Sequence, residues 1–273
     1  MKKIIVRFLA LGLILSLSSC GSHPPQVSNA SDIEKLDPQT TGSIVGRGLS
    51  ESDIPSLAKL DGLQQLFLNH GDAAGGLKMT DSGLKALSET KLPSLRYIGI
   101  SYSRNITDNG IEAISKISTL KQIIINGLPE ITDKSLEYLA KMPHLEQLFI
   151  SGCPGITDEG IQLLRTYPSL NWVMLGGMDF GSSLEMKKVL EQINNIDMNL
   201  ETQITVEGVV NAFKGSKIER IEIDTLNPEF FTEQSKSLFC KELSGYTLIV
   251  RTLVGPKLEK IKAWRVSECV KTQ

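Results

Sequence analysis

The stretch that decides the fold is Leu145-Glu-Gln-Leu148-Phe-Ile150-Ser-Gly-Cys153-Pro-Gly-Ile156-Thr157-Asp158-Glu-Gly160-Ile161-Gln-Leu-Leu164. Its first three apolar positions have the spacing of a turn and a short strand, in which successive side chains point to opposite faces. Thr157 can cap the helix that follows, and Asp158 then lies in the first turn, where the helix dipole favours negative charge. Ile161 and Leu164 are three residues apart and share one helical face. The stretch therefore predicts a strand, a polar turn and a helix.

The same pattern begins three more times, at Leu63, Leu95 and Leu120, with spacings of 25 to 32 residues between successive copies. Each copy enters its helix through a Thr-Asp pair, and these are Thr80-Asp81, Thr107-Asp108 and Thr132-Asp133. A fixed period of this length is typical of a solenoid, in which each unit buries its apolar edge against the next. Such a chain builds a surface rather than an enclosed pocket.

The phrase Ser151-Gly-Cys-Pro-Gly-Ile-Thr-Asp-Glu-Gly-Ile161 resembles the cysteine-containing class of leucine-rich repeat. In the other units Ser103, Leu128 and Met178 take the place of Cys153. The resemblance implies an α/β fold, a leucine-rich-repeat solenoid with a parallel concave sheet, convex helices and a modified C-terminal cap. It is specific for the fold and carries little information about a partner.

Weaker units flank the regular ones. Residues 49–63 match the helical half of a repeat and are expected to form an N-terminal cap, and residues 170–175 predict a fifth strand. Residues 204–223 read as a degenerate unit with the same internal offset. We further expect helices over 183–194 and 229–242 and strands over 246–254 and 258–266, because the last repeat of a solenoid must end the stack.

The N-terminus indicates export. A basic start and an apolar run from Phe8 to Leu17 are typical of a secretory signal, and the run is too short for a comfortable transmembrane helix. Leu17-Ser-Ser-Cys20 resembles a bacterial lipobox, which implies that Cys20 is acylated, with palmitate-type chains, and becomes the first residue of the mature protein. The alternative is an ordinary signal peptide with an incidental cysteine. An aspartate directly after the acylated cysteine would resemble a signal for retention in the inner membrane. Gly21 and Ser22 stand there instead, so the expected destination is the outer membrane.

These patterns divide the chain into four parts: a lipoprotein signal peptide (1–19), an acylated cysteine and flexible tether (20–41), the solenoid (42–180), and a degenerate repeat with the C-terminal cap (181–273). The tether is predicted from its content of Pro, Ser, Asn and Gln. The chain has 29 basic and 31 acidic residues, and cleavage before Cys20 removes three basic ones, which leaves a net charge of −5. This charge argues against nucleic acid as a general partner.

We find no pattern for catalysis. The histidines, at 23, 70 and 144, lack ligand spacing, so no metal site is expected. The sequence has no phosphate-binding glycine loop and no Gly-x-Ser-x-Gly elbow, so we expect no enzyme activity, cofactor or small-molecule substrate. The recurring aspartates, at 81, 108, 133 and 158, are interpreted as first-turn helix residues rather than calcium ligands.

The cysteines fall into two groups. Cys153 occupies an inward-facing position and is predicted to be a small buried apolar residue. Cys240 and Cys269 are predicted to form a disulfide, because disulfides persist in exported proteins and these two remain once Cys20 and Cys153 are assigned. The alternative is two unpaired thiols.

Strand alternation assigns three columns to the concave sheet. The first is Gln65, Tyr97, Gln122, Gln147 and Trp172; the central one is Phe67, Gly99, Ile124, Phe149 and Met174; the third is Asn69, Ser101, Asn126, Ser151 and Gly176. The central column is mainly apolar, and a contiguous apolar stripe often marks an interaction site. The predicted protein-binding residues are Phe67, Tyr97, Ile124, Gln147, Phe149, Trp172 and Met174. The alternatives are that these side chains only pack on one another, or that the C-terminal region covers them.

The leading hypothesis is therefore a membrane-anchored lipoprotein that binds another protein through its concave face. The partner would be an envelope protein, a host molecule or a secreted toxin that the chain neutralises as an immunity-type protein. The competing hypothesis is a structural envelope scaffold without a discrete ligand.

Overall fold

The computed structural model describes residues 24–69, 79–176, 204–225, 228–254 and 260–266. Within these residues ten strands form one sheet in sequence order. They are β1 (Gln26–Val27), β2 (Ser43–Arg47), β3 (Gln65–Asn69), β4 (Tyr97–Ser101), β5 (Gln122–Asn126), β6 (Gln147–Ser151), β7 (Trp172–Gly176), β8 (Arg220–Asp224), β9 (Thr247–Val254) and β10 (Lys260–Arg265). Neighbouring strands from β1 to β9 are parallel, and β10 runs antiparallel to β9.

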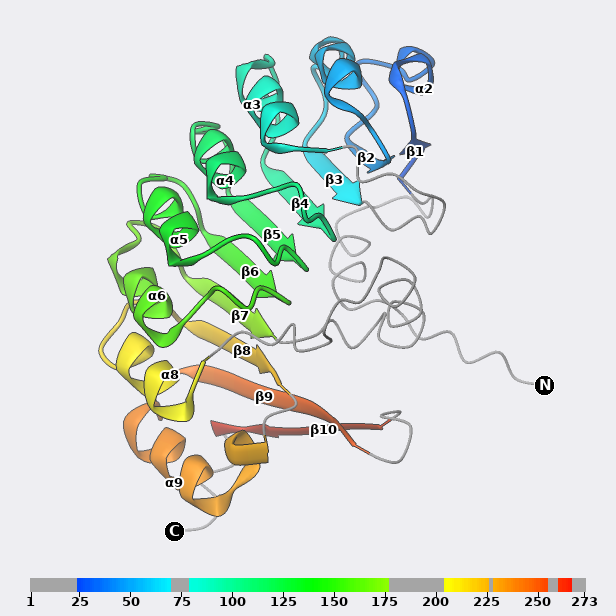
Figure 1. Ribbon diagram of the computed structural model, residues 1–273. Helices are drawn as coiled ribbons and strands as arrows, with labels where there is room; N and C mark the ends of the chain where they lie inside the picture. Colours follow the sequence, from blue (N-terminus) through cyan, green and yellow to red (C-terminus); the bar gives the residue numbers. More distant parts are fainter. Residues whose placement is uncertain (1–23, 70–78, 177–203, 226–227, 255–259, 267–273) are drawn as a thin grey trace, which may run out of the picture.

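Helices connect successive parallel strands. They are α2 (Ala30–Glu34), the 3₁₀ helix η1 (Glu51–Lys59), α3 (Asp81–Glu89), α4 (Asp108–Ser115), α5 (Asp133–Leu139), α6 (Asp158–Gln162) with the 3₁₀ turn η2 (Leu163–Thr166), α8 (Val206–Phe213), and the 3₁₀ turn η3 (Pro228–Phe231) followed by α9 (Glu233–Glu242). Figure 1 shows the helices along the outer arc of a curved solenoid and the strands along its inner side. The predicted fold class is confirmed.

The core lies between the sheet and the helices. Each regular repeat contributes inward strand residues such as Leu148 and Ile150, and helix residues such as Ile161 and Leu164, all of them fully buried. These side chains belong to one continuous apolar cluster that runs from Val27 to Val266. The stacking of one repeat on the next therefore provides a single core, as a solenoid requires.

The register of the sheet agrees with the predicted columns. Gln65, Tyr97, Gln122, Gln147 and Trp172 are successive partners from β3 to β7, and the central and third columns align in the same way. The alignment continues into β8, where Arg220 and Glu222 extend the first and central columns. The concave residues of distant repeats thus form continuous rows.

The predicted tether is wrong over residues 26–41. β1 pairs in parallel with β2, and α2 follows with Asn29 as its N-cap. Val27 and Ile33 are buried, with exposed fractions of 1% and 0%. These two apolar residues give the segment enough burial to join the stack, so the N-terminal cap begins well before residue 49.

The solenoid also continues past residue 180, where the predicted division placed its end. β8 pairs with β7 in parallel, and β9 pairs with β8 in the same way. The predicted unit over 204–223 is present as α8 and β8. The predicted helix over 183–194 lies outside the described residues, as do the signal peptide and Cys20.

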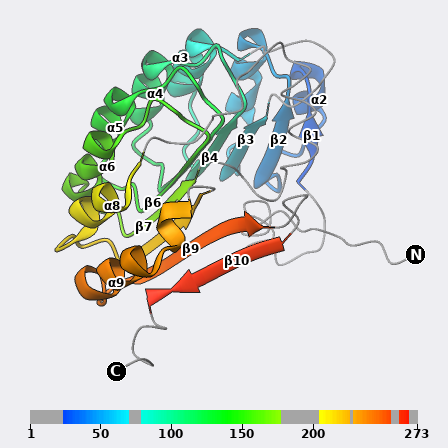
Figure 2. The same ribbon diagram turned by 60° about the horizontal axis from the view of Figure 1, so that its bottom comes forward.

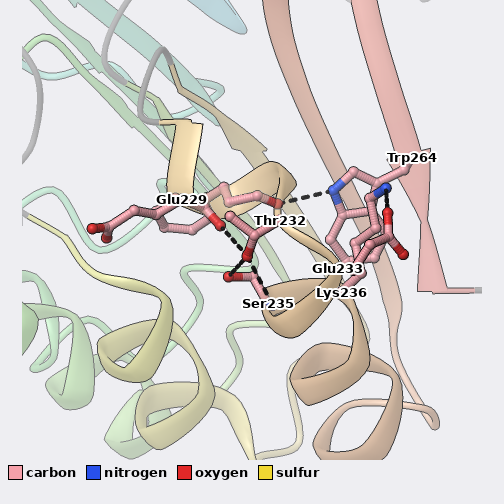
Figure 3. A network of polar contacts seen from close by, with 7 residues as sticks. Glu229, Thr232, Glu233, Ser235, Lys236 and Trp264 are labelled. Atoms are coloured by element: carbon pink, nitrogen blue, oxygen red, sulfur yellow. Dashed lines mark hydrogen bonds and ion pairs between the residues drawn. The ribbon is translucent and has the colours of Figure 1, made fainter.

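The stack ends on its C-terminal side with α9, β9 and β10 (Figure 2), and an aromatic cluster joins α9 to β10. The ring centroids of Phe230 and Phe239 are 6.0 Å apart, and those of Phe239 and Trp264 are 5.6 Å apart. The Trp264 indole N–H donates to the Phe230 carbonyl at 3.1 Å, and Thr232 caps α9 by accepting from the Ser235 N–H (Figure 3). The predicted helix over 229–242 is thus a 3₁₀ turn and a separately capped α-helix.

No helix among the described residues is long and apolar enough to span a membrane.

Candidate functional site

The concave face, defined as the three columns of β3 to β7, is the best candidate for a site. Five strands contribute three positions each, and none of these fifteen residues is charged. In the whole chain 22% of the residues are charged. Because a solvated sheet face ordinarily carries charged side chains among its polar ones, this composition favours contact with another molecule.

Six of the seven predicted binding residues lie half-buried on this face, and they are Phe67, Tyr97, Ile124, Gln147, Trp172 and Met174. The prediction that Phe149 is an accessible contact is wrong, because only 3% of this residue is exposed. Phe149 is buried outside the main apolar cluster between sheet and helices. Its side chain lies on the concave side of the sheet but is covered by its neighbours.

Trp172 is a neighbour of Phe149 on this face. Their ring centroids are 5.0 Å apart in an edge-to-face arrangement, a geometry that stabilises aromatic pairs. The Arg220 guanidinium also lies over the Trp172 ring, with its central carbon 4.3 Å from the ring centroid. Arg220 also donates from Nε to Glu222 Oε1 at 2.7 Å. Phe149 and Arg220 together hold Trp172 in one orientation.

The charged pair Arg220–Glu222 marks the end of the uncharged face. Glu222 has 4% exposure, while the side chain of Arg220 keeps 45% of its surface exposed. The buried carboxylate fixes the Nε side of the guanidinium, and the exposed part remains available to solvent or a partner. Sequence analysis missed this pair because the columns were followed only as far as β7.

A row of polar side chains lines the rim where the strands end. Tyr102 has φ 59°, in a turn position that Gly127 and Gly152 occupy in the next two repeats with φ 65° and 61°. This conformation costs a residue with a Cβ about 1–2 kcal/mol. Asn126 Nδ2 donates to the Tyr102 hydroxyl at 2.8 Å, and Ser151 Oγ donates to Asn126 Oδ1 at 2.8 Å. The row extends the concave face with hydrogen-bonding groups of fixed orientation.

The recurring aspartates lie on a different edge, at the helix starts, and form a ladder between repeats. Each carboxylate accepts from the backbone N–H and the hydroxyl of the threonine that begins the next helix. The pairs are Asp81–Thr107, Asp108–Thr132, Asp133–Thr157 and Asp158–Thr205, with distances of 2.6–2.9 Å. The aspartates are therefore structural, as predicted, but they act between repeats as well as in their own helix.

The ladder also explains the small residue three positions after each threonine. A Cβ on Gly160 would lie 1.9 Å from Asp133 Oδ1, and one on Gly208 would lie 1.8 Å from Asp158 Oδ1. Ser135 occupies the same position in another repeat and donates its hydroxyl to Asp108 Oδ1 at 2.6 Å. The carboxylate of one repeat thus fills the space above the helix start of the next.

The cysteines are the remaining candidate residues. Cys153 is fully buried as predicted, and burial raises the pKa of its thiol to about 12, so it stays protonated and unreactive. Cys240 is disulfide-bonded; Cys269 lies outside the described residues, so their pairing stays a prediction. The described part of the chain contains no cluster of three His, Cys, Asp or Glu side chains suited to a metal ion.

Comparison with known proteins identifies the repeat. Residues 141–164 match a family model described as Leucine Rich repeat. No curated protein matches the chain in sequence. The chain has the fold and the repeat of a leucine-rich-repeat protein.

Solved structures with similar folds include a chain of the yeast Rad7–Elc1 complex, with 16% identity, a TM-score of 0.48 and coverage of 81% of this chain. This chain spans 58% of that one. LegL7 from Legionella pneumophila, a leucine-rich-repeat-containing protein, has 10% identity and a TM-score of 0.42, with coverage of 83% of this chain and 90% of that one.

Proposed function

We propose that this protein is an exported lipoprotein, anchored through an acylated Cys20 to a bacterial membrane, most simply the outer membrane, that binds another protein through its concave face. The observation that carries the binding part is the absence of charge from all fifteen concave positions of β3 to β7. Depletion of charged residues and enrichment of aromatic ones distinguish the centres of protein interfaces from ordinary surface.

The half-buried aromatic side chains of this face are the proposed anchors. Phe67, Tyr97 and Trp172 offer large apolar areas whose rotation costs little entropy, and such residues dominate binding energy at interfaces. The ring of Trp172 is contacted by Phe149 and by Arg220, and both contacts restrict its orientation. Arg220, at the border of the face, adds a cation to which a partner carboxylate or carbonyl can bind.

The repeats are further proposed to belong to the cysteine-containing class of leucine-rich repeat. Cys153 supports this assignment, because its side chain is fully buried and its Sγ lies 3.2 Å from the Ser151 carbonyl oxygen, which fixes the turn after β6. The immunity-type function, neutralisation of a secreted toxin, is one form of the proposed binding. A scaffold without a discrete ligand is the competing function.

Chemical crosslinking of intact cells, followed by purification of the tagged protein from the envelope fraction, tests the proposal. We expect the wild-type protein to be crosslinked to one discrete partner. The amount of crosslinked product should fall at least tenfold with Trp172→Ala and stay unchanged with Glu137→Ala on the exposed helical side. Circular dichroism would verify that both variants remain folded. If Trp172→Ala, Phe67→Ala and Tyr97→Ala all retain the wild-type crosslinks, the concave face is not the binding site.

A further inference from the structure

We infer that the N-terminal cap, defined as β1, α2 and β2, is the end of the solenoid that lies nearest the membrane. The concave face of the protein would then bind a protein in or beside the same membrane. The inference rests on the proposed acylation of Cys20 and deepens it. It concerns how far the anchored domain can move from the bilayer, which decides which partners can reach its concave face.

The chain is fixed to the sheet from Pro25 onward. The Pro25 carbonyl accepts a hydrogen bond from the Val45 N–H at 2.9 Å, in line with the β1–β2 pairing. Further along, the Ala30 N–H donates to Asp53 Oδ1 at 2.9 Å, which ties α2 to the start of η1. With Val27 and Ile33 fully buried, the cap is an integral part of the stack.

Only residues 21–24 therefore separate the acylated cysteine from Pro25, the first residue fixed to the sheet. An extended chain spans at most about 3.6 Å per residue, so residues 21–25 reach about 18 Å. Pro24 and Pro25 favour the polyproline II conformation, which rises only about 3.1 Å per residue. A tether that continued to Thr41 would reach about 75 Å by the same measure. The order of the cap thus shortens the possible reach about fourfold.

This reach is small compared with the molecule. Ten strands spaced about 4.8 Å apart give a sheet roughly 43 Å long from β1 to β10, measured along its curve. The acyl chains hold Cys20 at the hydrocarbon boundary, and the headgroup layer occupies about 6 Å of the available distance. Pro25, where the cap begins, therefore stays about 12 Å or less beyond the headgroups. β3, the first strand of the concave face, is only two strand spacings farther along the stack.

The confinement follows from chain length and does not require lipid-binding charge on the cap. Lys35 forms an ion pair with Asp32, and Lys59 forms one with Glu34, both at 3.2 Å. The short covalent leash by itself keeps the cap near the bilayer, independently of contacts between lipids and cations such as the exposed Arg47. The concave face is consequently presented to proteins in or beside the same membrane.

Site-specific fluorescence quenching tests this arrangement. Ser31→Cys places a probe on α2, and Ser237→Cys places a matched probe on α9; both serines are exposed helix residues. The native Cys153 does not compete for the label because it is fully buried. The full-length acylated protein is purified from the envelope, labelled, added to preformed phosphatidylethanolamine–phosphatidylglycerol vesicles, and titrated with lipids that carry a headgroup spin label.

We expect the Ser31 probe to be quenched at least twofold more strongly than the Ser237 probe. Insertion of 20 Gly/Ser residues between Ser22 and His23 should remove most of this difference, because the longer leash frees the cap. Equal quenching of the two probes in the native-length protein would overturn the inference. If the protein fails to float with the vesicles and its mass shows no acyl chains, the proposed anchoring has failed instead.

Discussion

Asp133 accepts hydrogen bonds from both the backbone N–H and the hydroxyl of Thr157, at 2.8 and 2.6 Å. The carboxylate of one repeat thus satisfies the start of the helix in the next. Since the same relationship recurs at every described helix start from Thr107 to Thr205, the Thr-Asp pair is a contact between repeats. The Asp158–Thr205 pair shows that the ladder stays continuous although 46 residues lie between its members.

Removal of one carboxylate should weaken the stack. Asp133→Ala is expected to lower the free energy of unfolding by about 2 kcal/mol, because hydrogen bonds to charged groups contribute roughly 1.5–3 kcal/mol each and this site is partly open to solvent. Urea unfolding followed by circular dichroism measures the change. Glu137→Ala, an exposed substitution on the same helix, should stay within about 0.5 kcal/mol of the wild type.

The close approach of Gly160 to the same carboxylate gives a second prediction. Gly160→Ala should destabilise the protein because its Cβ would displace Asp133 Oδ1. In the double variant with Asp133→Ala the carboxylate is absent. The loss of unfolding free energy in the double variant should therefore be smaller than the sum of the losses in the two single variants. Gly245→Ala serves as the control, since a Cβ there meets nothing within 4 Å. Strict additivity of the two changes would show that the carboxylate and the glycine are not coupled.

Asp108 gives the ladder a dependence on pH. Burial acts to raise the pKa of this carboxyl, but hydrogen bonds from Ser135 and Thr132 outweigh burial and hold the pKa below its ordinary value of 3.8. A group whose pKa is lower in the folded state contributes stability above its unfolded pKa and loses it as pH falls through the folded pKa. Below pH 3.8 the unfolding free energy of the wild type should therefore fall more steeply than that of Asp108→Asn. Urea titrations across this range compare the slopes, and parallel curves would contradict the assignment.

Much of the regular solenoid is predictable from sequence because a fixed period constrains both partners of every contact. Once Leu145, Leu148 and Ile150 are assigned inward, the alternate residues Gln147 and Phe149 must face the concave side. The columns follow when successive repeats are aligned. Alternation assigns a face but not a depth, however, and for this reason the burial of Phe149 beneath the surface was not predicted.

The N-terminal repeat escaped prediction for a different reason. Gly46 occupies the inward strand position that Leu68 holds in the next repeat, and the side chain of Leu49 fills the space instead. The apolar residue that completes this unit therefore comes from outside the strand. In β1 and α2 only Val27 and Ile33 are fully buried, in a segment whose Pro, Ser and Asn content is typical of a linker. A pattern based on three strand leucines cannot detect such a unit.

Acylation can be tested independently of binding. Cys20→Ala should prevent lipid attachment, so the protein should leave the membrane fraction or remain unprocessed. Metabolic labelling with a palmitate analogue and intact mass of the purified protein provide the measurements. Unchanged processing and labelling in the variant would contradict the lipobox assignment.

The predicted disulfide between Cys240 and Cys269 would close the C-terminal cap. Alkylation of the denatured but unreduced protein should modify Cys153 alone, and reduction beforehand should add two further alkyl groups. Peptide mapping should then place both new modifications at 240 and 269. Two alkylated thiols at these positions without reduction would rule out the bond.

Photocrosslinking from single positions in living cells tests the central claim most directly. A benzophenone side chain in place of Phe67 lies on the concave face, and one in place of Glu137 lies on the exposed helical side. We predict that irradiation links the Phe67 position to one discrete protein of the same membrane, that Trp172→Ala abolishes this product, and that the Glu137 position yields none. Products of equal abundance from both positions, or a Phe67 product that survives Trp172→Ala, would contradict binding through the concave face.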